Sequence, residues 1–296
     1  MGLGLFLVAY QAITDDGYIT VAFARNLAFH GQWAVTPGLL SNTATSPLYV
    51  LVLSAVTVVT RAPVVSLGVV LAASLATTAT LVSLTARRCG WSWWAGPIVA
   101  VLLATSPLMA STLGLESFLL VALLVWLLYA VVCGRPGWVG GVCGLVVMTR
   151  PDAAVFAVFA VLALVVMVRP IGAGQIARTV LLPPAAALAV VTPWAVASIA
   201  LFGTPIPNTL IWKADGRALL GGKYFYEAAP LFLKHWPAAT VLTLVLYGLG
   251  VLALLMWIVR APLHPVTILV GGGGLAHFVT MSALGVMTSL GITPRH

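Results

Sequence analysis

The sequence predicts an all-α, polytopic membrane protein, and two observations carry this prediction. The 296 residues are 61% hydrophobic and 7% charged, with a mean hydropathy of +1.12, whereas soluble domains carry about 25% charged residues. The apolar runs are about 20 residues long, as membrane-crossing helices are, and lack the alternation of transmembrane strands of about ten residues. The composition and the runs therefore exclude a soluble domain and a transmembrane barrel.

Charged residues, proline and glycine bound the apolar runs and define the expected membrane segments. In order they are 1–13, 64–86, 92–111, 115–133, 137–149, 153–169, 179–201, 238–259 and 264–287. We therefore expect about eight to nine membrane segments in a single domain, 1–296.

Some of these runs are too short to cross a membrane alone. Run 1–13 cannot span about 30 Å of hydrocarbon at 1.5 Å per residue. We interpret it as the second half of a first helix and expect the chain to be truncated at one or both ends. Run 137–149 is also short and is expected to dip partway. Residues 47–60 predict an interfacial or re-entrant helix in the first of two long polar loops, 14–63; the other is 202–237.

Arginines in short loops indicate the cytoplasmic side. If 14–63 lies outside, the inner loops contain arginines and no acid: Arg87, Arg88, Arg135, Arg169, Arg178 and Arg260. All six acidic residues then fall outside: Asp15, Asp16, Glu116, Asp152, Asp215 and Glu227. This partition predicts a multi-pass plasma (inner) membrane protein with an extracytoplasmic active face. The net charge of +8 reflects topology and lipid phosphate contacts, and we expect no nucleic-acid partner.

Cysteine and histidine spacing predicts no metal cluster. The three cysteines, Cys89, Cys133 and Cys143, have no CxxC spacing and form no disulfide framework. The histidines are dispersed along the chain.

Asp15 and Asp16 are the most informative polar residues. A carboxylate near a bilayer is costly to keep ionised and usually marks a site or a relay. Thr14 or one aspartate can cap a helix over 17–30, where a carboxylate offsets the positive helix end. One aspartate suffices for capping. We therefore expect one to act as a general base and the other to orient it or to hold a divalent cation, Mg²⁺ or Mn²⁺.

Further polar groups interrupt the apolar runs on the same predicted face. Glu116 starts a helix, where it either complements the dipole or serves a site. Arg150 and Asp152 flank a proline at membrane depth; they are a structural pair or, for Arg150, a phosphate contact. Residues 204–209 form a proline-rich loop followed by Lys213. The glycines at 271–274 predict a helix-packing face rather than a phosphate loop.

These motifs, taken in order, resemble those of the GT-C membrane glycosyltransferases. They are Asp15-Asp16-Gly17-Tyr18-Ile19 with downstream Arg25, Thr45-Ser46-Pro47-Leu48, Gly114-Leu115-Glu116, Arg150-Pro151-Asp152, and Pro207-Asn208-Thr209 with Lys213. The likeness covers roughly residues 10–240. The motifs are similar to those of the actinobacterial cell-wall arabinofuranosyltransferases, which use polyprenyl-phosphate sugars. It implies that Asp15 or Asp16 is the catalytic base.

The resemblance implies a transferase that moves a sugar from a polyprenyl-phosphate donor to a cell-envelope glycan or glycolipid hydroxyl. Its donor phosphate would be bound by Arg150, Lys213 and Arg25, and its substrates by Tyr18, Glu116, Asp152 and Asn208. Membrane lipid is a further expected partner. Two alternatives stay open: a lipid-linked-sugar transporter or flippase, and a non-catalytic cell-envelope assembly subunit. One-sided acids argue against the transporter, since transporters place ionisable residues at mid-membrane.

Overall fold

The computed structural model describes residues 2–209 and 233–283, and within them every regular element is a helix. The elements are α1 (Gly2–Ala9), η1 (Tyr10–Ala12), α2 (Asp15–His30), α3 (Pro47–Thr60), α4 (Pro63–Arg88), α5 (Ala95–Thr105), α6 (Pro107–Ala110), α7 (Ser117–Val132), α8 (Pro136–Thr149), η2 (Pro151–Ala154), α9 (Val155–Val168), α10 (Ala173–Phe202), α13 (Pro237–Arg260), the π-helix η3 (Thr267–Gly272) and α14 (Gly273–Ala283). The all-α prediction is confirmed for these residues.

Four helical stretches in the described residues are long and apolar enough to cross a membrane: 63–88, 151–168, 173–202 and 237–260. The other apolar helices, such as α8, have 10–17 residues. An expected run at 92–111 is interrupted, because α5 ends at Thr105 and Ser106 is extended. The structure thus supports a membrane protein with several apolar helices, and it does not establish the larger predicted number of crossings.

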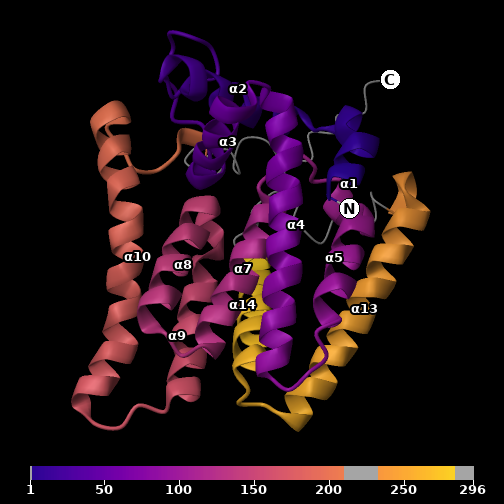
Figure 1. Ribbon diagram of the computed structural model, residues 1–296, viewed down its shortest axis with the longest axis vertical. Helices are drawn as coiled ribbons and strands as arrows, with labels where there is room; N and C mark the ends of the chain where they lie inside the picture. Colours follow the sequence, from indigo (N-terminus) through magenta and orange to yellow (C-terminus); the bar gives the residue numbers. More distant parts are fainter. Residues whose placement is uncertain (1, 210–232, 284–296) are drawn as a thin grey trace.

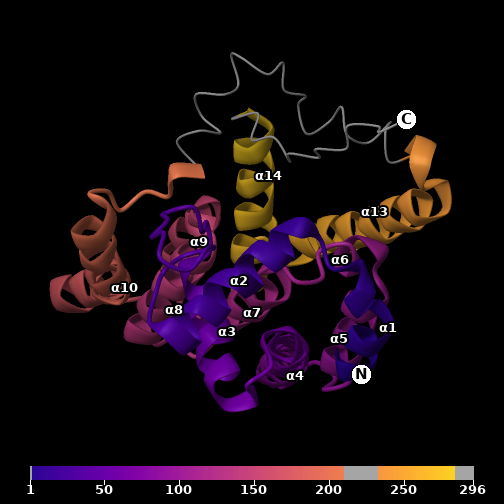
Figure 2. The same cartoon turned by 90° about the horizontal axis from the view of Figure 1, so that it is seen from above.

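The helices form a bundle with α2 and α3 at one end (Figure 1). Seen from above, α4 lies beside α7, while α10 and α13 lie at opposite edges of the bundle (Figure 2). The buried core lies in the middle of the bundle, where α7, α8 and α9 bury Leu127, Val139 and Leu164 completely. Long apolar faces of α10 and α13 remain exposed, as expected of helices that face lipid.

The start of α4 packs beside α3, where Thr57 donates a hydrogen bond to the Ser66 hydroxyl at 3.0 Å. Its other end carries Arg88, whose guanidinium lies 5.5 Å from the ring centre of Tyr129, near the end of α7. Since α7 begins after Glu116, this carboxylate lies one helix length away from Arg88.

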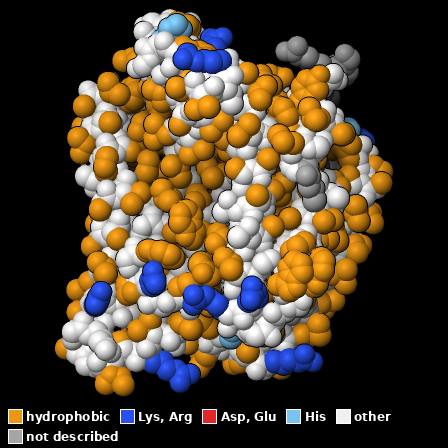
Figure 3. All heavy atoms as spheres, viewed as in Figure 1, with side chains coloured by type: hydrophobic (Ala, Val, Ile, Leu, Met, Phe, Trp, Pro, Cys, Tyr) orange, Lys and Arg blue, Asp and Glu red, His pale blue; other side chains and the backbone are white. Residues whose placement is uncertain are grey.

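The two ends of the bundle therefore differ in charge. We name the end with α2 the carboxylate end, defined by Asp15, Asp16, Glu116 and Asp152. The other is the arginine end, defined by Arg87, Arg88, Arg135, Arg169, Arg178 and Arg260. Figure 3 shows most of the basic side chains in view at the lower end, below a wide hydrophobic surface, a smaller basic group at the upper end, and no acidic side chain.

Candidate functional site at the carboxylate end

The first turn of α2 presents two adjacent carboxylates to the surface. Thr14 is extended, and its hydroxyl accepts a hydrogen bond from the Gly17 amide at 3.4 Å, which confirms the capping interpretation for Thr14. Asp15 and Asp16 are both exposed. Among the described residues neither forms an ion pair. Because Thr14 performs the capping, both carboxylates stay available for another role.

A close backbone approach joins α2 to the turn that precedes α7. A Cβ atom on Gly17 would lie 3.3 Å from the Gly114 Cα and 2.8 Å from Cγ2 of Ile13. Gly114 has a φ of +92°, a conformation that L side chains rarely adopt. The two glycines thus allow a contact that places the aspartate pair beside the turn leading into Glu116.

Glu116, Arg150 and Asp152 form an ion-pair network. Arg150 donates from Nε and Nη2 to the two Asp152 oxygens at 3.0 and 3.1 Å, and from Nη1 to Glu116 Oε1 at 3.3 Å. Its backbone is extended (φ −149°, ψ 112°) because Pro151 follows it, and this breaks the helix between α8 and η2. The break lets one guanidinium reach both carboxylates.

The network keeps Arg150 charged. Burial lowers the pKa of the guanidinium, but hydrogen bonds to Asp152 and the charges of Asp152 and Glu116 outweigh burial and raise the pKa above its ordinary value. A guanidinium has five N–H donors. Three are used by the network, so the remaining donors can contact a further anion.

His277 joins the network and was missed by the sequence analysis. Its Nε2 lies 3.8 Å from Asp152 Oδ2, and its ring lies 5.5 Å from that of Phe156. Within the described residues its Nδ1 is buried without a hydrogen-bond partner.

A helical register explains how His277 reaches Asp152 once α14 packs on α9. Asp152 and Phe156 lie four residues apart, as do Gly273 and His277, so each pair shares a helix face. A Cβ atom on Gly273 would lie 2.7 Å from Phe156 Cδ1. The glycine run is thus a helix-packing face at Gly273, as predicted, and this packing places His277 over Asp152.

The remaining predicted site residues are not part of this network. Arg25 is exposed, its Nη2 lies 3.3 Å from the neighbouring Asn26 Oδ1, and it lies about 15 Å from Asp15 along α2. Tyr18 is exposed one turn after Asp15. Lys213 lies outside the described residues.

Asn208 lies where the two long polar segments meet. The Asn42 carbonyl accepts a hydrogen bond from the Asn208 amide at 2.7 Å, and the Asn42 side chain donates to the carbonyls of Ile206 at 3.0 Å and Thr204 at 3.4 Å. Thr209 donates to the Thr43 carbonyl at 3.1 Å. These bonds hold 204–209 against the first polar segment.

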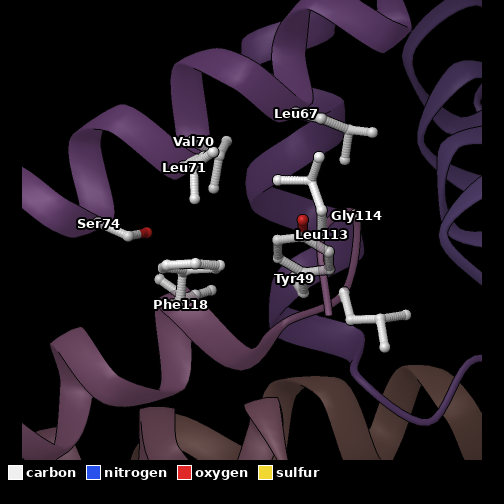
Figure 4. Close-up of a pocket in the computed structure, with 10 residues that line it drawn as sticks. Tyr49, Leu67, Val70, Leu71, Ser74, Leu113, Gly114 and Phe118 are labelled. Atoms are coloured by element: carbon white, nitrogen blue, oxygen red, sulfur yellow. The ribbon is translucent and has the colours of Figure 1, made fainter. Parts of the chain in front are cut away.

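A small cavity lies behind the Gly114 turn. Figure 4 shows Tyr49 from α3 and Ser74 from α4 among its lining residues. Its volume of about 10 Å³ is the space of one water molecule and not of a sugar. This cavity therefore does not hold a substrate.

No group of three or more His, Cys, Asp or Glu side chains that could hold a metal ion occurs in the described ranges. Asp15 and Asp16 alone provide two carboxylates. Mg²⁺ is commonly bound by one or two carboxylates and completes its shell with water and phosphate. The pair therefore fits such an ion only together with a substrate phosphate.

Comparisons with models of known families, with curated proteins and with solved structures found no match.

Proposed function

We propose that the chain is a membrane glycosyltransferase that moves a sugar from a polyprenyl-phosphate donor to a hydroxyl of a cell-envelope glycan or glycolipid. The reaction would take place at the carboxylate end, on the extracytoplasmic side of the plasma membrane. The arginine end would face the cytoplasm, since arginine-rich short loops are retained there.

One observation carries this proposal: three polar motifs that are far apart in the sequence meet at one end of an apolar bundle. The Gly17–Gly114 contact joins the first to the second, and the Glu116–Arg150 ion pair joins the second to the third. Residues that serve only as helix caps have no need to converge. A shared substrate gives a reason for the convergence.

Either Asp15 or Asp16 removes the proton from the acceptor hydroxyl as its oxygen attacks the anomeric carbon of the donor sugar. The carbon–oxygen bond to the phosphate breaks, and polyprenyl phosphate leaves with the electron pair. Both aspartates suit this role because neither is paired within the described part of the chain. The second aspartate orients the first or holds a divalent cation, which would offset the charge of the phosphate.

The leaving phosphate needs cations, for which Arg150, Lys213 and Arg25 are the candidates. Arg150 is the best supported, because it contacts Glu116, which follows the glycine turn that meets α2, and because it keeps free N–H donors. Arg25, one helix length away, can contribute only to a more distant part of the donor. Glu116, Asp152, Tyr18 and Asn208 are the proposed sugar contacts, and Arg150 fixes the first two in place.

The proposal is tested by incubating the purified chain in liposomes with a panel of radiolabelled polyprenyl-phosphate sugars and cell-envelope acceptors. Transfer of label to an acceptor supports a transferase. Movement of labelled lipid across the bilayer without transfer identifies a transporter. If the folded chain shows neither activity but binds other envelope proteins, it is an assembly subunit.

A further inference from the structure

An open cavity lies at the opposite end from the proposed active site. It has a volume of about 510 Å³ and opens between the end of α9 and the connection from α13 to η3. Its lining is Val166, Met167, Arg169, Ala261, Pro262, Leu263, His264 and Pro265. We propose that it binds the phosphate headgroup of an anionic membrane lipid.

The cation in this cavity has an unusual backbone. Arg169 ends α9 with a φ of +48°, a left-handed conformation that glycine adopts without strain. Arg61 has a similar φ of +55°, but its guanidinium packs over the Phe29 ring. Arg169 has no ion pair, side-chain hydrogen bond or aromatic partner in the part of the chain that is described. An unpaired guanidinium in a cavity is suited to bind a phosphate.

His264 supplies a second polar group. Its Nδ1 accepts a hydrogen bond from the Val266 amide at 3.2 Å. The proton of a neutral imidazole is then on Nε2, which can donate to an anion. The ring stacks on Trp91 at 5.9 Å and meets Trp257 edge-on at 5.4 Å, so its orientation is fixed.

The surroundings favour a lipid over a soluble phosphate. The other lining residues are apolar, and Met167 and Leu263 are exposed, so acyl chains can pack beside the charged group. Exposed tryptophans at 91, 93 and 94 lie at the same end, and tryptophans are enriched at the depth of lipid headgroups. The loop sequences 86–94, 133–136, 168–173 and 260–266 contain no acidic residue that would repel a phosphate. Basic pockets between helices are known to bind anionic headgroups.

The test is native mass spectrometry of the full chain in detergent, titrated with phosphatidylglycerol or phosphatidylcholine. We expect saturable binding of phosphatidylglycerol, stronger than that of phosphatidylcholine. Arg169→Gln should weaken it about tenfold or more, because a charge-assisted contact is lost. Arg169→Lys should retain most of the affinity. The matched control is Arg178→Gln, an exposed arginine of the same end that does not line the cavity, and it should bind as the wild type does.

Three results would overturn the proposal. Equal binding by Arg169→Gln and Arg178→Gln would show that only general positive charge matters. Equal binding of the two lipids would show that the phosphate charge is not recognised. Displacement of phosphatidylglycerol by a stoichiometric amount of inorganic phosphate would assign the cavity to a soluble anion. A melting curve for each variant tests whether its fold is intact. We expect an unchanged curve, because Arg169 is exposed and its replacement leaves no hole in the core.

Discussion

Gly17 and Gly114 touch backbone to backbone, and this contact joins the aspartate turn of α2 to the turn before α7. A Cβ atom on Gly17 would come within 3.3 Å of the Gly114 Cα. Gly17→Ala should therefore push the two turns apart, at a cost of about 1–3 kcal/mol in the free energy of unfolding. Sugar transfer should fall as well, because the aspartates directly precede this residue.

Gly141→Ala is the matched control, because a Cβ atom on this α8 residue meets nothing within 4 Å. It should leave stability unchanged or raise it by about 0.5–1 kcal/mol. Thermal unfolding and transfer rate per folded molecule are the measurements. Equal behaviour of the two variants would refute the role of the contact.

Arg150 should couple energetically to Glu116. Their side chains are 37% and 13% exposed, so removing either partner should cost less than the roughly 3–5 kcal/mol of a fully buried pair. A double-mutant cycle with Arg150→Gln and Glu116→Gln should give a coupling energy of about 0.5–3 kcal/mol. Arg178→Gln, at an exposed site, should combine additively with Glu116→Gln. Additivity in both cycles would show that the ion pair contributes nothing.

The Asn42 side chain should hold the 204–209 segment in place. It is 2% exposed, and its amide donates to two carbonyls of that segment. Asn42→Asp replaces this donor with an acceptor facing the same carbonyls, which should cost about 1–3 kcal/mol. Hydrogen exchange in 204–209 should speed up.

The matched control for Asn42 is Asn208→Asp. Asn208 uses its backbone amide in this contact, and its side chain is exposed. The stability of Asn208→Asp and the rate of hydrogen exchange in 204–209 should therefore stay close to those of the wild type. Unchanged exchange in Asn42→Asp would mean that the backbone bonds hold the segment without the side chain.

The carboxylate end and the arginine end should lie on opposite sides of the membrane. Leu39 lies at the carboxylate end and is 68% exposed, and Gly174 lies at the arginine end and is also exposed. Cysteines placed there, in a chain with Cys89→Ser and Cys133→Ser, should label oppositely with an impermeant reagent added to intact cells. Labelling at Leu39→Cys alone fits the proposed orientation. Labelling at both positions would contradict it.

Local signals in the sequence predicted much of the fold. Hydropathy predicted the helical class, and the Thr14 pattern predicted the start of α2. The proline at 151 predicted the break that frees Arg150. These signals act over a few residues, so a single sequence contains them. The number of crossings was harder to predict, because α5 and α8 are short and hydropathy does not show where a helix ends.

The contacts that assemble the site could not be predicted in this way. No local feature of the sequence links Gly17 to Gly114, and their contact depends on how α2 packs across the bundle. Asn42 had no local feature that would indicate its bonds to the Thr204 and Ile206 carbonyls. His277 was counted among dispersed histidines, because only the packing of α14 on α9 brings it to Asp152. Such pairings are set by tertiary structure.

The central claim is that Asp15 or Asp16 is the base of a sugar-transfer reaction. Transfer from a polyprenyl-phosphate sugar should be measured for purified Asp15→Asn and Asp16→Asn, with donor binding and thermal unfolding as controls. The amide keeps the shape of the side chain and removes its basicity. At the base, transfer should therefore fall by about 10²–10⁴, while donor binding persists and stability changes by no more than about 1 kcal/mol. Wild-type transfer rates in both variants would contradict the account and leave the pair as surface carboxylates of a helix terminus.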